Sequence, residues 1–234
     1  MIEKRKIKLS EAWMKVDFSK PSTWMIVFSN VIVIFFAIVD NLSAFEVLWI
    51  YWFQSVIIGV FNFIRIISLK EFTTTGFRRS GTELLPTKAA KFSTAIFFLI
   101  HYGFFHFVYA IFLGGFSGIT GSSTSNSQSS YLLITSLIFF ISYLIEYIQS
   151  TRTQPEIIPN LGVLMFAPYF RIIPMHFIII FGGFVSVFGS FISMNLDLLI
   201  IVLFVGIKTF IEIITNAVDL FSFSAQPVKE SIDN

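Results

Sequence analysis

Six apolar runs, each close to the length of a membrane-spanning helix, occupy most of this chain. The hydrocarbon core of a bilayer is crossed by about 20 helical residues. The six runs lie at residues 24–39, 45–67, 92–113, 130–149, 171–192 and 198–220. The sequence therefore predicts an all-α membrane bundle of about six transmembrane helices in the domain 24–220. This domain is preceded by the basic segment 1–23 and followed by the polar tail 221–234.

The composition argues against a soluble fold. Charged residues make up only 13% of the 234 residues, whereas soluble domains carry about 25%. The chain contains no cysteine, which excludes disulfides, thiolate chemistry and Cys-ligated metal clusters. We expect the lipid bilayer as the main partner and no nucleic acid. The sequence leaves open whether the chain forms a homo-oligomer or joins a larger membrane complex.

The basic residues indicate an orientation. Fifteen of the sixteen Lys and Arg residues lie before residue 24, between residues 65 and 91, between 152 and 171, or in the C-terminal tail. The connections 40–46, 114–130 and 193–197 contain none. Because Lys and Arg concentrate in cytoplasmic loops, this pattern predicts a multi-pass cell-membrane protein with both termini in the cytoplasm. The exception is Lys208, in the middle of the last span.

Two segments are harder to place. The N-terminal segment 1–23 fits either a short interfacial helix or a solvated basic tail. Residues 156–170 are apolar but are interrupted by Pro159 and Pro168. They fit either an interfacial or a re-entrant segment, so the placement of 150–170 stays open.

The last predicted span carries polar residues at helical spacing. Lys208, Glu212 and Asn216 follow one another every four residues, and this spacing places them on one face of a helix. A charged side chain at mid-membrane costs about 2.5–3.5 kcal/mol on insertion scales, so such a face needs partners. One interpretation is a polar crevice open to the cytoplasm. The other is a Lys208–Glu212 pair that neutralises itself.

Two histidines lie at depths comparable with this polar face. At 1.5 Å of rise per helical residue, His101 would lie roughly 14–16 Å from the cytoplasmic surface, near the level of Lys208. His176 would lie about 8 Å in, near Glu212. A site built from these four residues is therefore consistent in depth. The sequence does not show whether the third, fifth and sixth spans touch.

His101 and His106 need separate treatment, although both lie in the hexapeptide HYGFFH. Five residues on a regular helix place them about 140° apart. A π-bulge at Gly103 would bring them closer to alignment. On a regular helix, His106 instead shares a face with Tyr102 and Tyr109. Each histidine fits a hydrogen-bonded packing role, a proton or substrate contact, or metal or haem ligation, and the metal-ligand candidates are His101, His106 and His176.

Several stretches together resemble a known protein family. These are IYWFQSVIIGVFN, HYGFFHFVYAIF, PYFRIIPMHFIIIFGG and the final KTFIEI. They resemble an uncharacterised prokaryotic family of multi-pass membrane proteins that carries only a domain-of-unknown-function label. The resemblance covers most of the chain from the second span onward. It implies a membrane protein with several spans and supplies no activity.

The residues themselves favour a small transporter or a proton-coupled, channel-like protein. A histidine side chain titrates near neutral pH, which suits proton coupling. The alternatives are an accessory subunit of a membrane complex and a haem or metal protein that uses His101 and His176. No HExxH, GxSxG or paired-Asp motif indicates an enzyme, and the sequence names no cofactor. The path candidates are His101, His176, Lys208, Glu212, Asn216 and Gln54.

Overall fold

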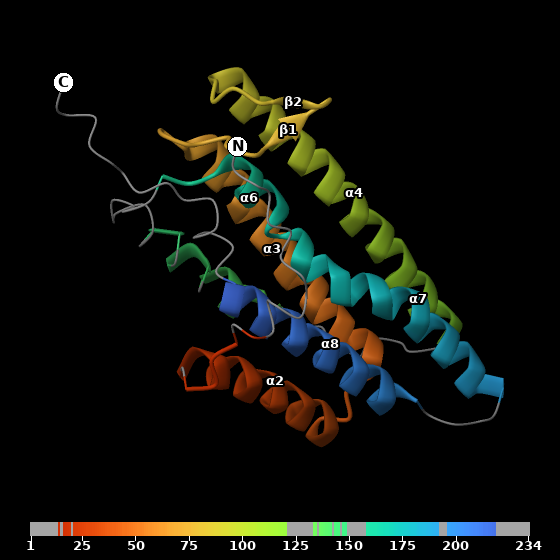
Figure 1. Ribbon diagram of the computed structural model, residues 1–234. Coiled ribbons are helices and arrows are strands. Elements are labelled where there is room, and N and C mark those ends of the chain that lie inside the picture. Colours follow the sequence, from red (N-terminus) through yellow and green to blue (C-terminus); the bar gives the residue numbers. More distant parts are fainter. Residues whose placement is uncertain are drawn as a thin grey trace, which may run out of the picture.

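The computed structural model describes residues 14, 16–19, 21–120, 133–134, 136–141, 143–145, 147–148, 158–191 and 196–218 (Figure 1). Most of them are helical. The helices are α2 (Pro21–Val39), α3 (Ala44–Ser68), α4 (Lys88–Thr120), α6 (Leu161–Phe166), α7 (Tyr169–Phe191) and α8 (Asp197–Val218). The strands β1 (Arg78–Arg79) and β2 (Thr82–Glu83) form one short hairpin. The predicted segments 1–23 and 221–234 lie mostly or wholly outside the described residues.

Four helical segments are long and apolar enough to cross a membrane: Ala44–Ser68, Lys88–Gly115, Leu161–Phe181 and Asp197–Thr215. They correspond to the second, third, fifth and sixth predicted spans. The first predicted span contains a shorter apolar helix, Ile26–Val39, and the fourth contains another, Ser136–Ile145, with parts of it outside the described residues. The chain is therefore a helical protein with several potential membrane spans. The number six and the orientation of the termini stay predictions.

Helix α3 is the centre of the described bundle. It contacts α4, α6, α7 and α8, while α8 also packs against α7 on one side and α2 on the other (Figure 1). The described part of the fourth predicted span lies beside α3 as well, because the ring of Phe61 contacts the rings of Phe140 and Tyr143. Residues on α3 are therefore placed to contact side chains from several helices.

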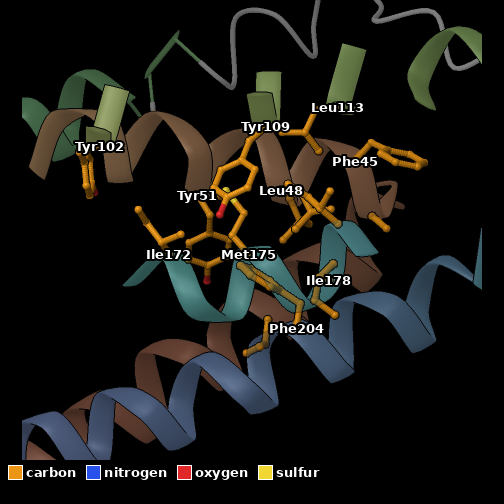
Figure 2. Close-up of a cluster of buried hydrophobic side chains, with 14 of the residues drawn as sticks. Phe45, Leu48, Tyr51, Tyr102, Tyr109, Leu113, Ile172, Met175, Ile178 and Phe204 are labelled. Carbon is orange, nitrogen blue, oxygen red and sulfur yellow. The ribbon is translucent and has the colours of Figure 1, made fainter. Parts of the chain in front are cut away.

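The interior between these helices is filled by apolar and aromatic side chains. Figure 2 shows α3, α4, α7 and α8 each contributing side chains to a single cluster. Lipid tails are as apolar as these side chains, so close packing contributes more to helix association in a membrane than removal from water does. The labelled members are Phe45, Leu48, Tyr51, Tyr102, Tyr109, Leu113, Ile172, Met175, Ile178 and Phe204.

The corner between α2 and α3 is built by a helix cap. The backbone N–H of Ser43 donates to Glu46 Oε2 at 2.7 Å, and the Glu46 N–H donates to Ser43 Oγ at 3.3 Å. This reciprocal pair is a capping box, which satisfies two N–H groups that a helix start leaves free. The N–H of Ala44 also donates to Asp197 Oδ1 at 3.3 Å. This bond joins the starts of α3 and α8.

At the other end of α3, the connection to α4 folds onto the segment before α6. Thr73 and Asn160 form a parallel β-bridge: the Thr73 N–H donates to the Pro159 carbonyl, and the Leu161 N–H donates to the Thr73 carbonyl, both at 2.9 Å. The side chain of Asn160 caps α6 by accepting from Gly162 and Val163. The described part of 156–170 thus contains the isolated β-bridge at Asn160, the short helix α6 and the start of α7, and α6 lies within the apolar segment Leu161–Phe181.

Candidate functional site

Lys208 and Glu212 form an ion pair on one face of α8. The distance from Lys208 Nζ to Glu212 Oε1 is 2.7 Å, and the two side chains are 19% and 24% exposed. Both residues lie within the potential span Asp197–Thr215. The pair is therefore mostly buried, yet both groups keep some accessible surface. Asn216, the third residue of the predicted polar face, belongs to α8, but its side chain lies outside the described residues.

The pair is not confined to its own helix, because Asn30 of α2 joins it. Lys208 Nζ donates to Asn30 Oδ1 at 2.9 Å, and Asn30 Nδ2 donates to Glu212 Oε2, also at 2.9 Å. Asn30 Nδ2 additionally donates to the Ile26 carbonyl. Asn30 is only 2% exposed. We call Asn30, Lys208 and Glu212 the α2–α8 polar network; each of its members contacts both of the others.

Tyr51 of α3 contacts this network from a third helix. Lys208 Nζ lies 4.9 Å from the centre of the Tyr51 ring, which is within the range of a cation–π contact. The Tyr51 side chain is buried, and its hydroxyl has no hydrogen-bond partner among the described residues. Figure 2 shows the side chain lying among those of α7 and α8. A cation is thus held by a carboxylate, an amide oxygen and an aromatic face from three helices.

Sequence reasoning assigned neither Asn30 nor Tyr51 to the site. Asn30 is separated from its partners by 178 and 182 residues, so spacing could not connect them. The available signal was an amide inside an apolar run, which is costly in lipid without a partner. The predicted face on α8 contributes its two charged residues to the network. The Lys208–Glu212 pair forms, and Asn30 of α2 hydrogen-bonds to both of its members.

His101 faces away from the α3–α4 interface. Its side chain is exposed, its Nδ1 lies 2.8 Å from the Tyr169 hydroxyl, and its ring stacks on Phe97 at 5.2 Å between centroids. Helix α4 runs without interruption through Gly103. The regular-helix interpretation of HYGFFH is therefore confirmed, and the two histidines do not converge.

His106 is buried beside Tyr102 and Tyr109, as that interpretation predicts. Its Nδ1 donates to the Tyr102 carbonyl at 2.9 Å, and its ring centroid lies 4.3 Å from that of Tyr102 and 6.0 Å from that of Tyr109. Its own carbonyl accepts from Trp52 Nε1 at 2.8 Å. Its Nε2 has no partner among the described residues. These contacts give His106 a packing role between α3 and α4.

His176 forms a hydrogen bond with Tyr109 of α4. Its Nδ1 lies 3.1 Å from the Tyr109 hydroxyl. The ring of Phe105 makes edge contacts with both His101 and His176, at 5.1 and 6.5 Å between centroids. The two imidazoles thus share an aromatic neighbour and direct their Nδ1 atoms to different tyrosines.

The predicted four-residue site is divided into two groups in the structure. Lys208 and Glu212 belong to the α2–α8 polar network, whereas His101 and His176 bond to tyrosines between α4 and α7. No hydrogen bond, ion pair or ring contact joins the two groups, whose side chains are all described. Within the described ranges, no group of three or more His, Asp or Glu residues could hold a metal ion. Gln54 is buried on α3.

The chain matches a protein-family model. No curated protein and no solved structure matches it. One family model matches residues 12–227, which is nearly the whole chain and includes every potential span. The expected membership of a family that carries only a domain-of-unknown-function label is thereby confirmed: this chain belongs to a family of unknown function (DUF6498).

Proposed function

We propose that this chain is a small transporter or a proton-coupled, channel-like membrane protein whose working site is the α2–α8 polar network. The observation that carries the proposal is the Lys208–Glu212 pair, held by Asn30 within the potential membrane region. Ionisable residues inside a membrane are expensive and usually mark ion or substrate paths. Stability alone gives a weak reason for the pair, since well-packed apolar residues often replace a buried ion pair without loss.

The geometry also supplies a way to couple a proton to helix movement. Both carboxylate oxygens of Glu212 are occupied, one by Lys208 and the other by Asn30. Protonation of Glu212 would remove its negative charge and weaken both contacts at once. Because Asn30 is the contact from α2, the packing of α2 on α8 would then depend on the protonation of one carboxylate. Asn216 and Gln54 stay candidates for the same path, on α8 and α3.

Proton flux tests this proposal. The purified full chain is reconstituted in liposomes that contain a pH-sensitive dye, and a potassium gradient with valinomycin drives proton movement. We expect flux above that of empty liposomes, with a large loss in Lys208→Met and Glu212→Gln. Lys70→Met is the matched control, because Lys70 lies exposed in the connection after α3. Equal flux in the wild-type chain, Lys208→Met and empty liposomes would overturn the proposal.

A second candidate is an accessory subunit of a membrane complex. The observation that favours it is the closure of the network: the chain itself supplies partners for both carboxylate oxygens of Glu212 and for the side-chain oxygen Oδ1 of Asn30. A network of this kind can serve only to join α2 to α8. The apolar double variant Lys208→Met/Glu212→Leu separates the two functions. If the network only joins α2 to α8, the double variant should fold and keep its function. If the network is a proton path, the double variant should lose proton flux.

The histidines give less support to haem or metal binding. His101 and His176 each place Nδ1 at a tyrosine hydroxyl, and His106 donates its Nδ1 proton to a backbone carbonyl. Their Nε2 atoms would be the ligands if a metal bound. An optical spectrum and metal analysis of the purified chain test this possibility directly, because a Soret band or stoichiometric metal would favour it.

A further inference from the structure

If α3 and α4 both cross a membrane, the connection between them lies at a membrane surface, whichever way the chain is oriented. Both flanking helices are potential spans, ending at Ser68 and beginning at Lys88. The 19 residues between them are therefore held close to the lipid headgroups on one side. Such a connection could be an irregular loop. Instead, it contains the β1–β2 hairpin and the bridge to Asn160.

The hairpin has a defined geometry. Arg78 pairs with Glu83 and Arg79 with Thr82. Ser80 and Gly81, with φ of 51° and 84°, form the turn, and a two-residue hairpin turn with both φ values positive matches the twist of the strands. Its base is closed by the Thr74 hydroxyl, which donates to the Leu84 carbonyl at 2.5 Å. Residues on this hairpin are thus held in fixed positions.

Two arginines on β1 form no ion pair with any residue that the structure describes. Arg78 and Arg79 are both exposed, and no carboxylate of a described residue lies within ion-pair distance of either. Glu83 stands opposite Arg78, but its Oε1 accepts a hydrogen bond from the Gly76 N–H at 2.7 Å. An arginine without a counter-charge at a membrane surface is well suited to a phosphate, because its planar guanidinium binds phosphate oxygens through two parallel hydrogen bonds.

The two arginines differ in their surroundings. Neighbouring strand residues point to opposite faces of a hairpin. Arg79 reaches the first turns of α4, where its Nη1 donates to Ser93 Oγ at 3.4 Å. The next residue toward the helix start, Phe92, is 50% exposed, and Leu85 after β2 is 72% exposed. Arg79 therefore lies beside a potential span whose apolar side chains are available to acyl chains.

We propose that Arg79, positioned by the β1–β2 hairpin against Ser93 of α4, binds the phosphate of an anionic lipid headgroup. The guanidinium holds the phosphate, and Phe92 and Leu85 contact the upper part of the acyl chains. Arg78, on the opposite face, does not take part. The site is independent of the α2–α8 polar network, so a failure of the transport proposal leaves this one untouched.

Lipid binding by the detergent-purified full chain tests this site. Phosphatidylglycerol with a fluorescent acyl chain is titrated in mixed micelles, and its anisotropy reports binding. A charge-assisted hydrogen bond lost from the complex corresponds to about a tenfold weaker binding or more. We expect this loss in Arg79→Gln, a smaller loss in Arg79→Lys, and less than about a twofold change in the matched control Arg78→Gln. Because both arginines are exposed, the unfolding temperatures should agree among all these variants.

Two competition arms separate the possible sources of phosphate. Unlabelled phosphatidylglycerol should displace the probe, whereas phosphatidylcholine and inorganic phosphate, at matched ionic strength, should not. Displacement by inorganic phosphate would assign the site to a soluble anion and overturn the lipid proposal. Equal losses in Arg79→Gln and Arg78→Gln would also overturn it, because they would indicate attraction to general positive charge. Unchanged binding in Arg79→Gln would have the same consequence.

Discussion

The ring of Tyr102 on α4 lies directly against the backbone of Gly59 on α3. A β-carbon added to Gly59 would lie 2.8 Å from Tyr102 Cδ1, closer than carbon atoms approach without displacement. Tyr102 is fixed from its other end, because its hydroxyl contacts Ser55 Oγ at 2.8 Å and donates to the Ser55 carbonyl at 3.0 Å. Helices α3 and α4 therefore meet at a small residue, as helices in membranes commonly do.

The first prediction concerns this contact. Gly59→Ala should destabilise the chain by about 1–3 kcal/mol, the usual cost of overpacking a closed interior. The tyrosine ring cannot swing aside without losing its bonds to Ser55. Gly103→Ala is the matched control, because nothing lies within 4 Å of a β-carbon at that position and alanine favours a helix over glycine. Thermal unfolding in one detergent should separate the two variants, and equal unfolding temperatures would contradict the assigned contact.

The apolar runs predicted the long helices well, because membrane-spanning helices need length and little charge. Helices α3, α4, α7 and α8 overlap nearly the whole of four of the six predicted spans, whereas the apolar segment that contains most of the fifth begins earlier, at Leu161. Lys208 and Glu212 also stood out, since charges within apolar runs are rare. For a regular helix, the spacing also predicted His106 beside Tyr102 and Tyr109. These features are local, so a single sequence contains enough information to predict them.

The partners across helices could not be predicted in the same way. Asn30 meets residues of the last helix, and that contact depends on which helices are neighbours in space. The shared depth of His101 and Lys208 was a necessary condition for a common site and proved insufficient, because α4 and α8 present these residues to different neighbours. The β1–β2 hairpin was also missed. Its strands have two residues each, which is too short for an alternating pattern.

The second prediction concerns the ion pair of α8. Lys208→Met alone should destabilise the chain strongly, by about 3–5 kcal/mol, because it leaves the Glu212 carboxylate buried without its cation. Lys208→Met/Glu212→Leu should recover much of that loss. The coupling between the two sites is read from unfolding temperatures of the four chains in a double-mutant cycle. Thr209→Ala is the control, since within the described ranges its hydroxyl bonds only to the Val205 carbonyl of α8 itself. If the effects of the two single substitutions on stability simply add, Lys208 and Glu212 do not form a strongly stabilising ion pair.

The third prediction uses the Tyr51 hydroxyl, which has no hydrogen-bond partner among the described residues. A buried polar group without a hydrogen bond costs about 1–3 kcal/mol, so Tyr51→Phe should leave the unfolding temperature unchanged or raise it. The ring that faces Lys208 is retained in this variant. Tyr109→Phe is the matched control and should destabilise by about 1 kcal/mol, because it removes the bond to His176 Nδ1. If Tyr51→Phe lowers stability as much as Tyr109→Phe, the Tyr51 hydroxyl has a partner that its described neighbours do not supply.

The fourth prediction concerns Asn160, which joins the α3–α4 connection to α6. Its Oδ1 accepts from the N–H groups of Gly162 and Val163 at 2.9 and 3.2 Å, and its Nδ2 donates to the Thr75 carbonyl at 3.0 Å. Asn160→Ala removes both functions and should destabilise by about 1–2 kcal/mol from the lost cap alone.

Asn160→Asp separates the two functions of this side chain. A carboxylate still caps the helix and favours its positive end, but it cannot donate to Thr75. We therefore expect an intermediate stability, with hydrogen exchange of the Gly162 and Val163 amides as slow as in the wild-type chain. In Asn160→Ala those two amides should exchange faster. If the Asp variant exchanges as fast as the Ala variant, the cap is not what protects these amides, and the β-bridge between Thr73 and Asn160 must hold the start of α6 instead.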